Sequence, residues 1–249
     1  MIRLSVNVNK IATLRNSRGG RVPSVIDAIE TCLDAGAPGI TVHPRADERH
    51  VRPADVHDAA AIVSRRRDGP NGRVEFNIEG DPRPAFLDMV LAVRPDQCTL
   101  VPVMPGEVTS QAGWAADAPS EMLRATISRL KTAGIRVSLF VDPAEAPVRW
   151  AAMMGADRIE LYTEPFAHAF KAGGQIAAAS FARYADAARL AHSLGLGVNA
   201  GHDLDLENLT MFKALPHLDE VSIGHALISR ALWVGLDRVV REYLAALAL

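Results

Sequence analysis

The chain alternates between short apolar runs and longer stretches in which apolar residues recur at helical spacing. Each run is followed by a helical pattern, which is typical of repeated βα units around a parallel sheet. The apolar residues between Val25 and Leu33 follow such a pattern, and Gly36 then suits a left-handed helix cap. The predicted strands occupy residues 3–9, 39–43, 74–79, 97–102, 136–142, 158–164, 197–202 and 220–225.

Eight such units within 249 residues predict a single (β/α)₈ TIM-barrel domain over residues 1–249. A doubly wound open sheet is the alternative. Two long irregular segments, 10–23 and 103–119, follow strands and are predicted to be polar loops with a function.

Composition narrows the possible partners. The formal net charge of -2 offers no general attraction to nucleic acid or to an anionic membrane. No apolar run reaches transmembrane length, and no signal peptide opens the chain. Cys32 and Cys98 lie in apolar contexts without metal-ligand spacing, which favours a reducing, cytoplasmic compartment.

Polar side chains gather where the predicted strands end. Chemistry in a TIM barrel belongs at the carboxyl ends of its strands, although polar residues also mark where any strand leaves the core. His57, His168, His192 and His217 lie elsewhere, and we expect them to be solvated or packed. The polar strand-end residues are Asn7, Asn9, His43, Asn77, Glu79, Glu160, Tyr162, Thr163, Asn199, His202 and His225.

Two segments predict phosphate sites. "NAGHD" and "SIGHALISRAL" place Gly201 and Gly224 beside histidines after the last two strands, where ligand oxygens can approach the backbone. "HPRADERH" offers a second anion site through its histidines and Arg45, whose planar guanidinium suits phosphate. The arginines of the first loop, Arg15, Arg18 and Arg21, could close over either site or simply be solvated. This arrangement suits a reaction that joins two phosphorylated small molecules.

Three mechanistic classes remain open. A Schiff-base aldolase is disfavoured because Lys10 is the only lysine near a strand end. A metal-dependent barrel could use His43, Glu79, His202 and His225, but no His-x-His pair lies on a strand. General acid–base catalysis without a metal or cofactor fits these residues better. A non-catalytic phosphate-binding barrel is the third alternative.

The motifs together resemble the pyridoxine 5′-phosphate synthase family of vitamin B6 biosynthesis, collinearly over nearly the whole chain. The resemblance implies a TIM barrel in a homo-octamer. It also implies condensation of 3-amino-2-oxopropyl phosphate with 1-deoxy-D-xylulose 5-phosphate to pyridoxine 5′-phosphate, phosphate and water. It rests on "VNVNKIATLRNSRGG", "GITVHPRADERHV", "FNIEG", "LVPVMPGEVTS", "VSLFVD", "IELYTE", "VNAGHDL" and "IGHALISRAL".

The same resemblance implies roles for individual residues. His43 and Glu79 would accept protons, His202 would donate one, and Glu160 would stabilise a transition state. The amino-ketone phosphate would contact Asn7, Arg18, Gly224 and His225, and the deoxyxylulose phosphate would contact Arg45, His50 and Thr109.

The chain departs from the family pattern at three positions that we also assign to substrate binding. Asn9 and Lys10 stand where many members have Asp-His, and Asp203 stands where glycine is frequent. Lys10 can preserve a contact with an anion, whereas Asn9 cannot act as a carboxylate. Asp203 raises the question of whether it keeps His202 protonated. The stretch between His50 and Glu79 is also longer than in many members.

Overall fold

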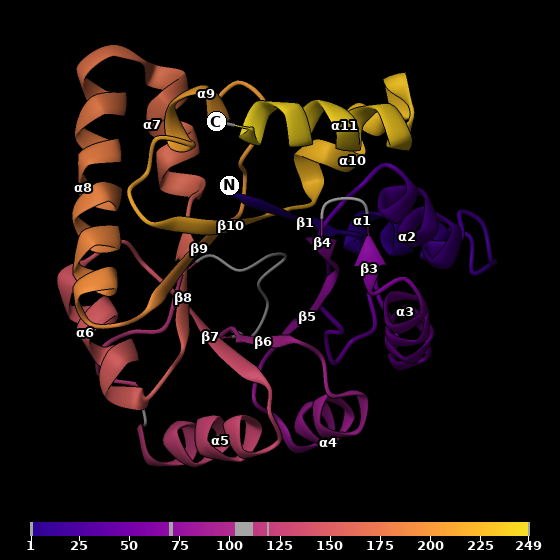
Figure 1. The fold of residues 1–249 in the computed structure, drawn as a ribbon, viewed down its shortest axis with the longest axis horizontal. Helices are drawn as coiled ribbons and strands as arrows, with labels where there is room; N and C mark the ends of the chain where they lie inside the picture. The colour runs from indigo at the N-terminus through magenta and orange to yellow at the C-terminus, as the bar shows by residue number, and fades with distance from the viewer. Residues whose placement is uncertain (1, 70–71, 103–111, 119, 249) are drawn as a thin grey trace.

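The structure is a closed barrel of eight parallel strands surrounded by helices (Figure 1). It is a computed structural model that describes residues 2–69, 72–102, 112–118 and 120–248. Around the barrel the strands follow the order β1-β10-β9-β8-β7-β6-β5-β2, which confirms the TIM barrel and excludes the open sheet. The strands are β1 (Arg3–Asn7), β2 (Gly39–Val42), β5 (Glu75–Gly80), β6 (Gln97–Leu100), β7 (Arg136–Val141), β8 (Arg158–Tyr162), β9 (Gly197–Gly201) and β10 (Leu218–Ile223).

Each predicted apolar run overlaps one barrel strand, and the described helices form the outer layer. A small antiparallel pair, β3 (Asp68–Gly69) with β4 (Gly72–Arg73), was not predicted. The helices are α1 (Asn9–Asn16), α2 (Val25–Asp34), α3 (Pro53–Arg65), α4 (Pro84–Val93), α5 (Ser120–Thr132), α6 (Glu145–Met154), α7 (Glu164–Ala172), α8 (Gly174–Ser193), α9 (Leu209–Phe212), α10 (His225–Val234) and α11 (Leu236–Leu247).

The prediction of a loop over residues 10–23 is wrong for its first half. Helix α1 begins at Asn9, shortly after the end of β1, and continues to Asn16. Ala12 and Arg15 are buried one helical turn apart, so the segment has an inward face despite its polar composition. The sequence did not reveal this inward face, because an arginine is normally expected to be exposed to solvent.

The two faces of the barrel sheet differ in polarity: the outer face is apolar and the inner face is polar. Successive side chains of a strand point to opposite faces. Leu4 and Val6 of β1 belong to the hydrophobic core that packs against the helices. Between them, Ser5 hydrogen-bonds Thr41 of β2 at 2.6 Å. Bulky branched residues usually fill a TIM barrel, so this polar interior is unusual.

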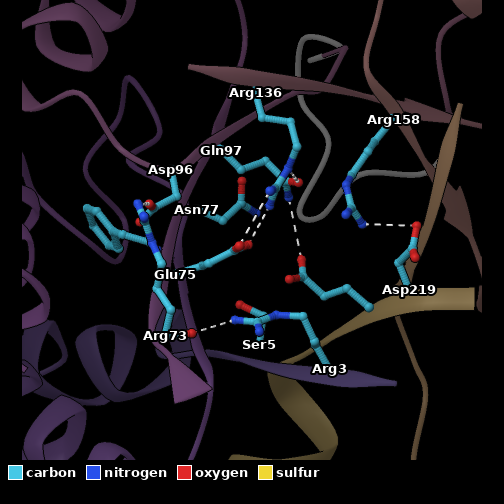
Figure 2. A network of polar contacts seen from close by, with 12 residues as sticks. Arg3, Ser5, Arg73, Glu75, Asn77, Asp96, Gln97, Arg136, Arg158 and Asp219 are labelled. Carbon is cyan, nitrogen blue, oxygen red and sulfur yellow. Dashed lines mark hydrogen bonds and ion pairs between the residues drawn. The ribbon is translucent and has the colours of Figure 1, made fainter. Parts of the chain in front are cut away.

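Hydrogen bonds cross the polar interior at the amino ends of the strands. Figure 2 shows Arg136 of β7 pointing toward Glu75 of β5, which it contacts at 2.5 Å. Asn199 of β9 donates to Gln97 of β6 and to Glu220 of β10, both at 3.3 Å. Partners on non-adjacent strands therefore close this end of the barrel.

Among the helices described, none is both long enough and apolar enough to cross a membrane.

Candidate active site

A cavity of about 450 Å³ opens at the carboxyl ends of the barrel strands. Residues from most of the strand ends line it, as the barrel topology predicts. Its lining consists of Asn7, Asn9, Lys10, Thr13, His43, Arg45, Arg49, His50, Glu79, Val101, Phe140, Glu160, Glu164, His202, Asp203, Gly224 and His225.

His43 and Glu79 form a pair in the wall of the cavity. His43 follows β2 and Glu79 lies near the end of β5, and these strands are neighbours in the barrel. Nδ1 of His43 lies 3.9 Å from Oε2 of Glu79, and both residues are buried. Asn7 donates a hydrogen bond to the same carboxyl oxygen, and Ser222 donates to Oε1, each at 3.4 Å. The strand ends therefore hold an imidazole and a carboxyl within reach of one ligand.

Burial sets the protonation of this pair. Desolvation lowers the pKa of His43 to about 3, and the nearby charges of His50 and Arg45 act in the same direction. Desolvation also raises the pKa of Glu79 to about 8, opposed by the hydrogen bond from Ser222 and assisted by Glu220. At neutral pH the imidazole is therefore a free base, and the carboxyl mostly carries its proton.

Glu160 of β8 is a second buried carboxyl in the cavity wall. Desolvation, followed by the charges of Glu79 and Glu220, raises its pKa well above the usual value. Gly201 of the neighbouring strand β9 makes room for this side chain. A Cβ on Gly201 would lie 2.2 Å from Oε1 of Glu160.

The structure gives both glycines a reason other than the predicted one, which stays a prediction. We expected Gly201 and Gly224 to let a ligand approach the backbone. The Cβ position of Gly201 faces Glu160, and a Cβ on Gly224 would lie 3.1 Å from Cβ of Asn7. Gly224 still lines the cavity and directly precedes α10, whose first residue is His225. The amino end of that helix can therefore attract an anion.

His202 sits in a left-handed turn after β9. Its φ is 85°, that of Asp203 is 60°, and residues other than glycine rarely adopt this region. Asp is among the residues that tolerate it best, which explains physically how Asp203 can replace glycine. Oδ2 of Asp203 lies 3.2 Å from Nδ1 of His202. This hydrogen bond, assisted by the charge of His202 and opposed by burial, holds the pKa of Asp203 below its usual value.

The predicted anion site after β2 is formed in part. Arg45 and His50 are both in the lining, and the rings of His43 and His50 lie edge to face with centroids 5.9 Å apart. Nε2 of His43 and Nδ1 of His50 are buried without a hydrogen-bond partner among the described residues. Buried polar atoms rarely lack partners, so these two atoms are available to a water molecule or to a bound ligand.

Most of the predicted site residues line this cavity. Arg18 does not; it is exposed beyond the end of α1. Thr109 lies outside the described residues. Arg15 is not a loop arginine over the site but is buried in an ion pair.

Sequence reasoning missed five residues of the lining. Glu164 ends the "IELYTE" motif and could have been found by its position, but Val101 and Phe140 gave no signal because they resemble ordinary core residues. The missed residues are Thr13, Arg49, Val101, Phe140 and Glu164.

One group of described side chains has the composition and spacing of metal ligands. Glu164, His202 and Asp203 each offer one ligand atom, and these atoms lie within 4.8 Å of one another. Imidazole with two carboxylates suits a divalent transition metal.

The cavity of this TIM barrel supports acid–base chemistry on an anionic small molecule. Neutral imidazoles and protonated carboxyls lie together in it, beside Arg45 and the amino end of α10. Comparison with known proteins gives the family. The pyridoxal phosphate biosynthesis protein PdxJ family matches residues 4–248, and the chain belongs to it.

Relatives agree with this assignment, and a solved structure agrees with the fold. Pyridoxine 5′-phosphate synthase of Bacteroides fragilis strain YCH46 is 51% identical over 244 residues, covering 98% of each chain. The enzyme of the same name from Christiangramia forsetii is 50% identical over 248 residues, covering 99% of this chain and 100% of its own. The expected pyridoxine 5′-phosphate synthase activity is confirmed through the family. N-(5′-phosphoribosyl)anthranilate isomerase from Pyrococcus furiosus has a TM-score of 0.60 and 12% identity, covers 99% of this chain and 98% of its own, and shows the fold alone.

Proposed function

We propose that this chain condenses 3-amino-2-oxopropyl phosphate with 1-deoxy-D-xylulose 5-phosphate to form pyridoxine 5′-phosphate, phosphate and water. The observation that carries the proposal is the contact between His43 and Glu79, where a neutral imidazole and a carboxyl of raised pKa share one cavity wall. A ring-closing condensation needs several proton transfers, and Glu79, whose pKa of about 8 lies near neutral pH, is suited to them.

The two sides of the cavity suit the two phosphates. Asn7, Gly224 and His225 adjoin the amino end of α10 and would hold the amino-ketone phosphate. On the other side, Arg45, His50 and Lys10 would hold the deoxyxylulose phosphate through their donors. The reacting groups of both substrates then face the His43 and Glu79 pair between them.

The proton transfers follow from the protonation states. The substrate's ammonium group would lower the pKa of Glu79, because an opposite charge favours the carboxylate, and Glu79 then accepts a proton from the amine. His43, neutral through burial, accepts a proton from carbon. His202 donates a proton to the leaving oxygen. Glu160, kept protonated by its surroundings, donates a hydrogen bond to negative charge that develops on oxygen.

The oligomer and the domain organisation are part of the same proposal. We take residues 1–249 to act as one domain in a homo-octamer, as the family resemblance implies. The exposed side chains of Leu232 and Trp233 on α10, 67% and 88% accessible in the single chain, support an interface on that helix.

The experiment is a two-substrate assay with purified protein. We expect phosphate release together with a fluorescent pyridine product, without added metal. Glu79→Gln should lower kcat by ~10²–10⁴-fold, the usual loss for an acid–base group, with both KM values nearly unchanged. If wild-type protein forms no product with or without divalent metal, the proposed function is wrong. An unchanged kcat in the variant would show that Glu79 has only a structural role.

A further inference from the structure

A buried ion pair lies behind the cavity without lining it. Arg15 of α1 donates to both carboxylate oxygens of Asp55 in α3, at 2.5 Å and 2.8 Å. Their side chains are only 9% and 13% exposed. Asp55 neutralises Arg15, so this arginine is not available as a cation for substrate. Its contribution to the site must therefore be geometric.

The pair holds the backbone at His50 and two residues after it. Arg15 donates through Nη2 to the carbonyl of His50 at 3.4 Å, and Asn16 donates to the same carbonyl at 2.8 Å. On the other side, Oδ2 of Asp55 accepts the backbone N–H of Arg52 at 2.8 Å. One guanidinium–carboxylate unit thus connects the end of α1 to the backbone at His50 and Arg52.

The segment that receives these contacts has no regular structure of its own. Residues 43–52 contain no helix or strand, yet four of their side chains line the cavity: His43, Arg45, Arg49 and His50. The backbone N–H of His43 is held by Asn9 at the other end, at 2.9 Å. Because the segment lacks a ladder of internal hydrogen bonds, contacts from α1 and α3 determine where its side chains point.

A planar guanidinium suits this task better than other cations. Its fixed fork of donors can engage two carboxylate oxygens and a carbonyl together, whereas a lysine ammonium is a single point of attachment. The cost of breaking a buried pair is high, because the remaining charge stays uncompensated. The guanidinium and the carboxylate can therefore move little relative to each other.

We propose that Arg15 and Asp55 are positioning residues that set the affinity for the phosphorylated substrate held by Arg45 and His50. This inference rests on the proposed function, which places 1-deoxy-D-xylulose 5-phosphate on that side of the cavity. The amino-ketone phosphate, held by Gly224 and His225, does not depend on the segment that the pair fixes. Loss of the pair then affects the two substrates unequally.

The test compares the two KM values in Arg15→Lys, which keeps the charge and loses the fork. We expect the KM for 1-deoxy-D-xylulose 5-phosphate to rise by about 10-fold or more, as misplaced contacts predict, while the KM for the amino-ketone phosphate stays within about 2-fold. Asn16→Ala removes the donor to the His50 and Glu48 carbonyls and the acceptor of Arg15 Nε. It keeps both bonds between Arg15 and Asp55, and should give a smaller rise in the same KM.

Arg136→Lys is the matched control. Arg136 pairs with Glu75 at the opposite end of the barrel, with side chains 26% and 21% exposed. This variant should lower the thermal midpoint and leave the ratio of the two KM values unchanged, because a loss of general stability does not distinguish the substrates.

Each outcome decides the proposal. Equal rises in both KM values, or no change in either, would overturn the positioning role. If Arg15→Lys does not fold, the KM ratio in Asn16→Ala decides instead. If the wild-type protein shows no turnover, the proposed function fails separately, and calorimetric binding of 1-deoxy-D-xylulose 5-phosphate to wild type and to Arg15→Lys then tests the positioning role. Equal dissociation constants would contradict it.

Discussion

Gly201 shows how an absent side chain can place the side chain of a neighbouring strand. The carboxyl of Glu160 occupies the space that any Cβ at position 201 would need. The glycine is not required by its backbone angle, since its φ is not positive. The sequence predicted Gly201 as part of the site. The side chain that needs the space at Gly201 is that of Glu160, on the neighbouring strand and 41 positions away along the chain. Sequence spacing alone could not predict that contact.

At the same scale, Gly201→Ala should displace the Glu160 carboxyl. We expect kcat to fall by at least about 10-fold, and stability to fall by roughly 1–3 kcal/mol through overpacking. Steady-state kinetics and chemical denaturation measure the two effects. Gly155→Ala is the control: its φ is 83° and nothing lies within 4 Å of its Cβ position, so it should cost stability through backbone strain only. Equal kcat losses in both variants would contradict the Glu160 mechanism.

At the scale of elements, the start of α1 connects two strand ends. Asn9 accepts the backbone N–H of His43 through Oδ1, and its own N–H donates to Oδ1 of Asn7 at 3.0 Å. The first helix thus orients the residue that ends β2. Asn9 can therefore replace the aspartate that many family members have at this position, because an amide oxygen and a carboxylate oxygen can both accept that hydrogen bond.

The Asn9 contact predicts which substitutions the element tolerates. Asn9→Asp keeps the acceptor and should retain kcat within about 3-fold, whereas Asn9→Leu leaves the His43 N–H without a partner. That loss costs about 1–3 kcal/mol, and we expect at least a 10-fold drop in kcat. Single-turnover kinetics check this, since chemistry is the affected step. A leucine variant as active as the aspartate variant would contradict the positioning of His43 by Asn9.

The elements also show where sequence reasoning succeeds and fails. All eight strands and the barrel were predictable, because apolar runs and glycine caps report burial within a few residues. Helix α1 was missed because its buried contact is an arginine whose partner, Asp55, lies 40 residues later. Local patterns report which residues are apolar, but they do not report which charges are paired.

At the scale of the whole molecule, the buried carboxyls make stability depend on pH. The folded chain raises the pKa of Glu79 from 4.5 to about 8, so between these values it binds a proton that the unfolded chain has released. The unfolding free energy of the wild type therefore decreases through this group as the pH rises across that window.

Glu79→Gln removes this dependence. The unfolding free energy of the variant minus that of the wild type should increase between pH 5 and pH 8, by at most about 1.4 kcal/mol per pH unit, and level off above pH 8. Denaturant titrations at fixed protein concentration measure the difference at each pH. A difference that stays constant across the window would mean that the carboxyl is not protonated in the folded chain.

The polar barrel interior has a consequence for how the chain reaches its native state. Asn199 of β9 finds its partners on β6 and β10, and Ser5 of β1 finds its partner on β2. A sheet lacking any of these strands would leave buried polar groups without partners, at a cost of about 1–3 kcal/mol for each. Partly assembled barrels are therefore less stable. The hydrogen bonds inside the barrel make the final closure of the ring of strands cooperative.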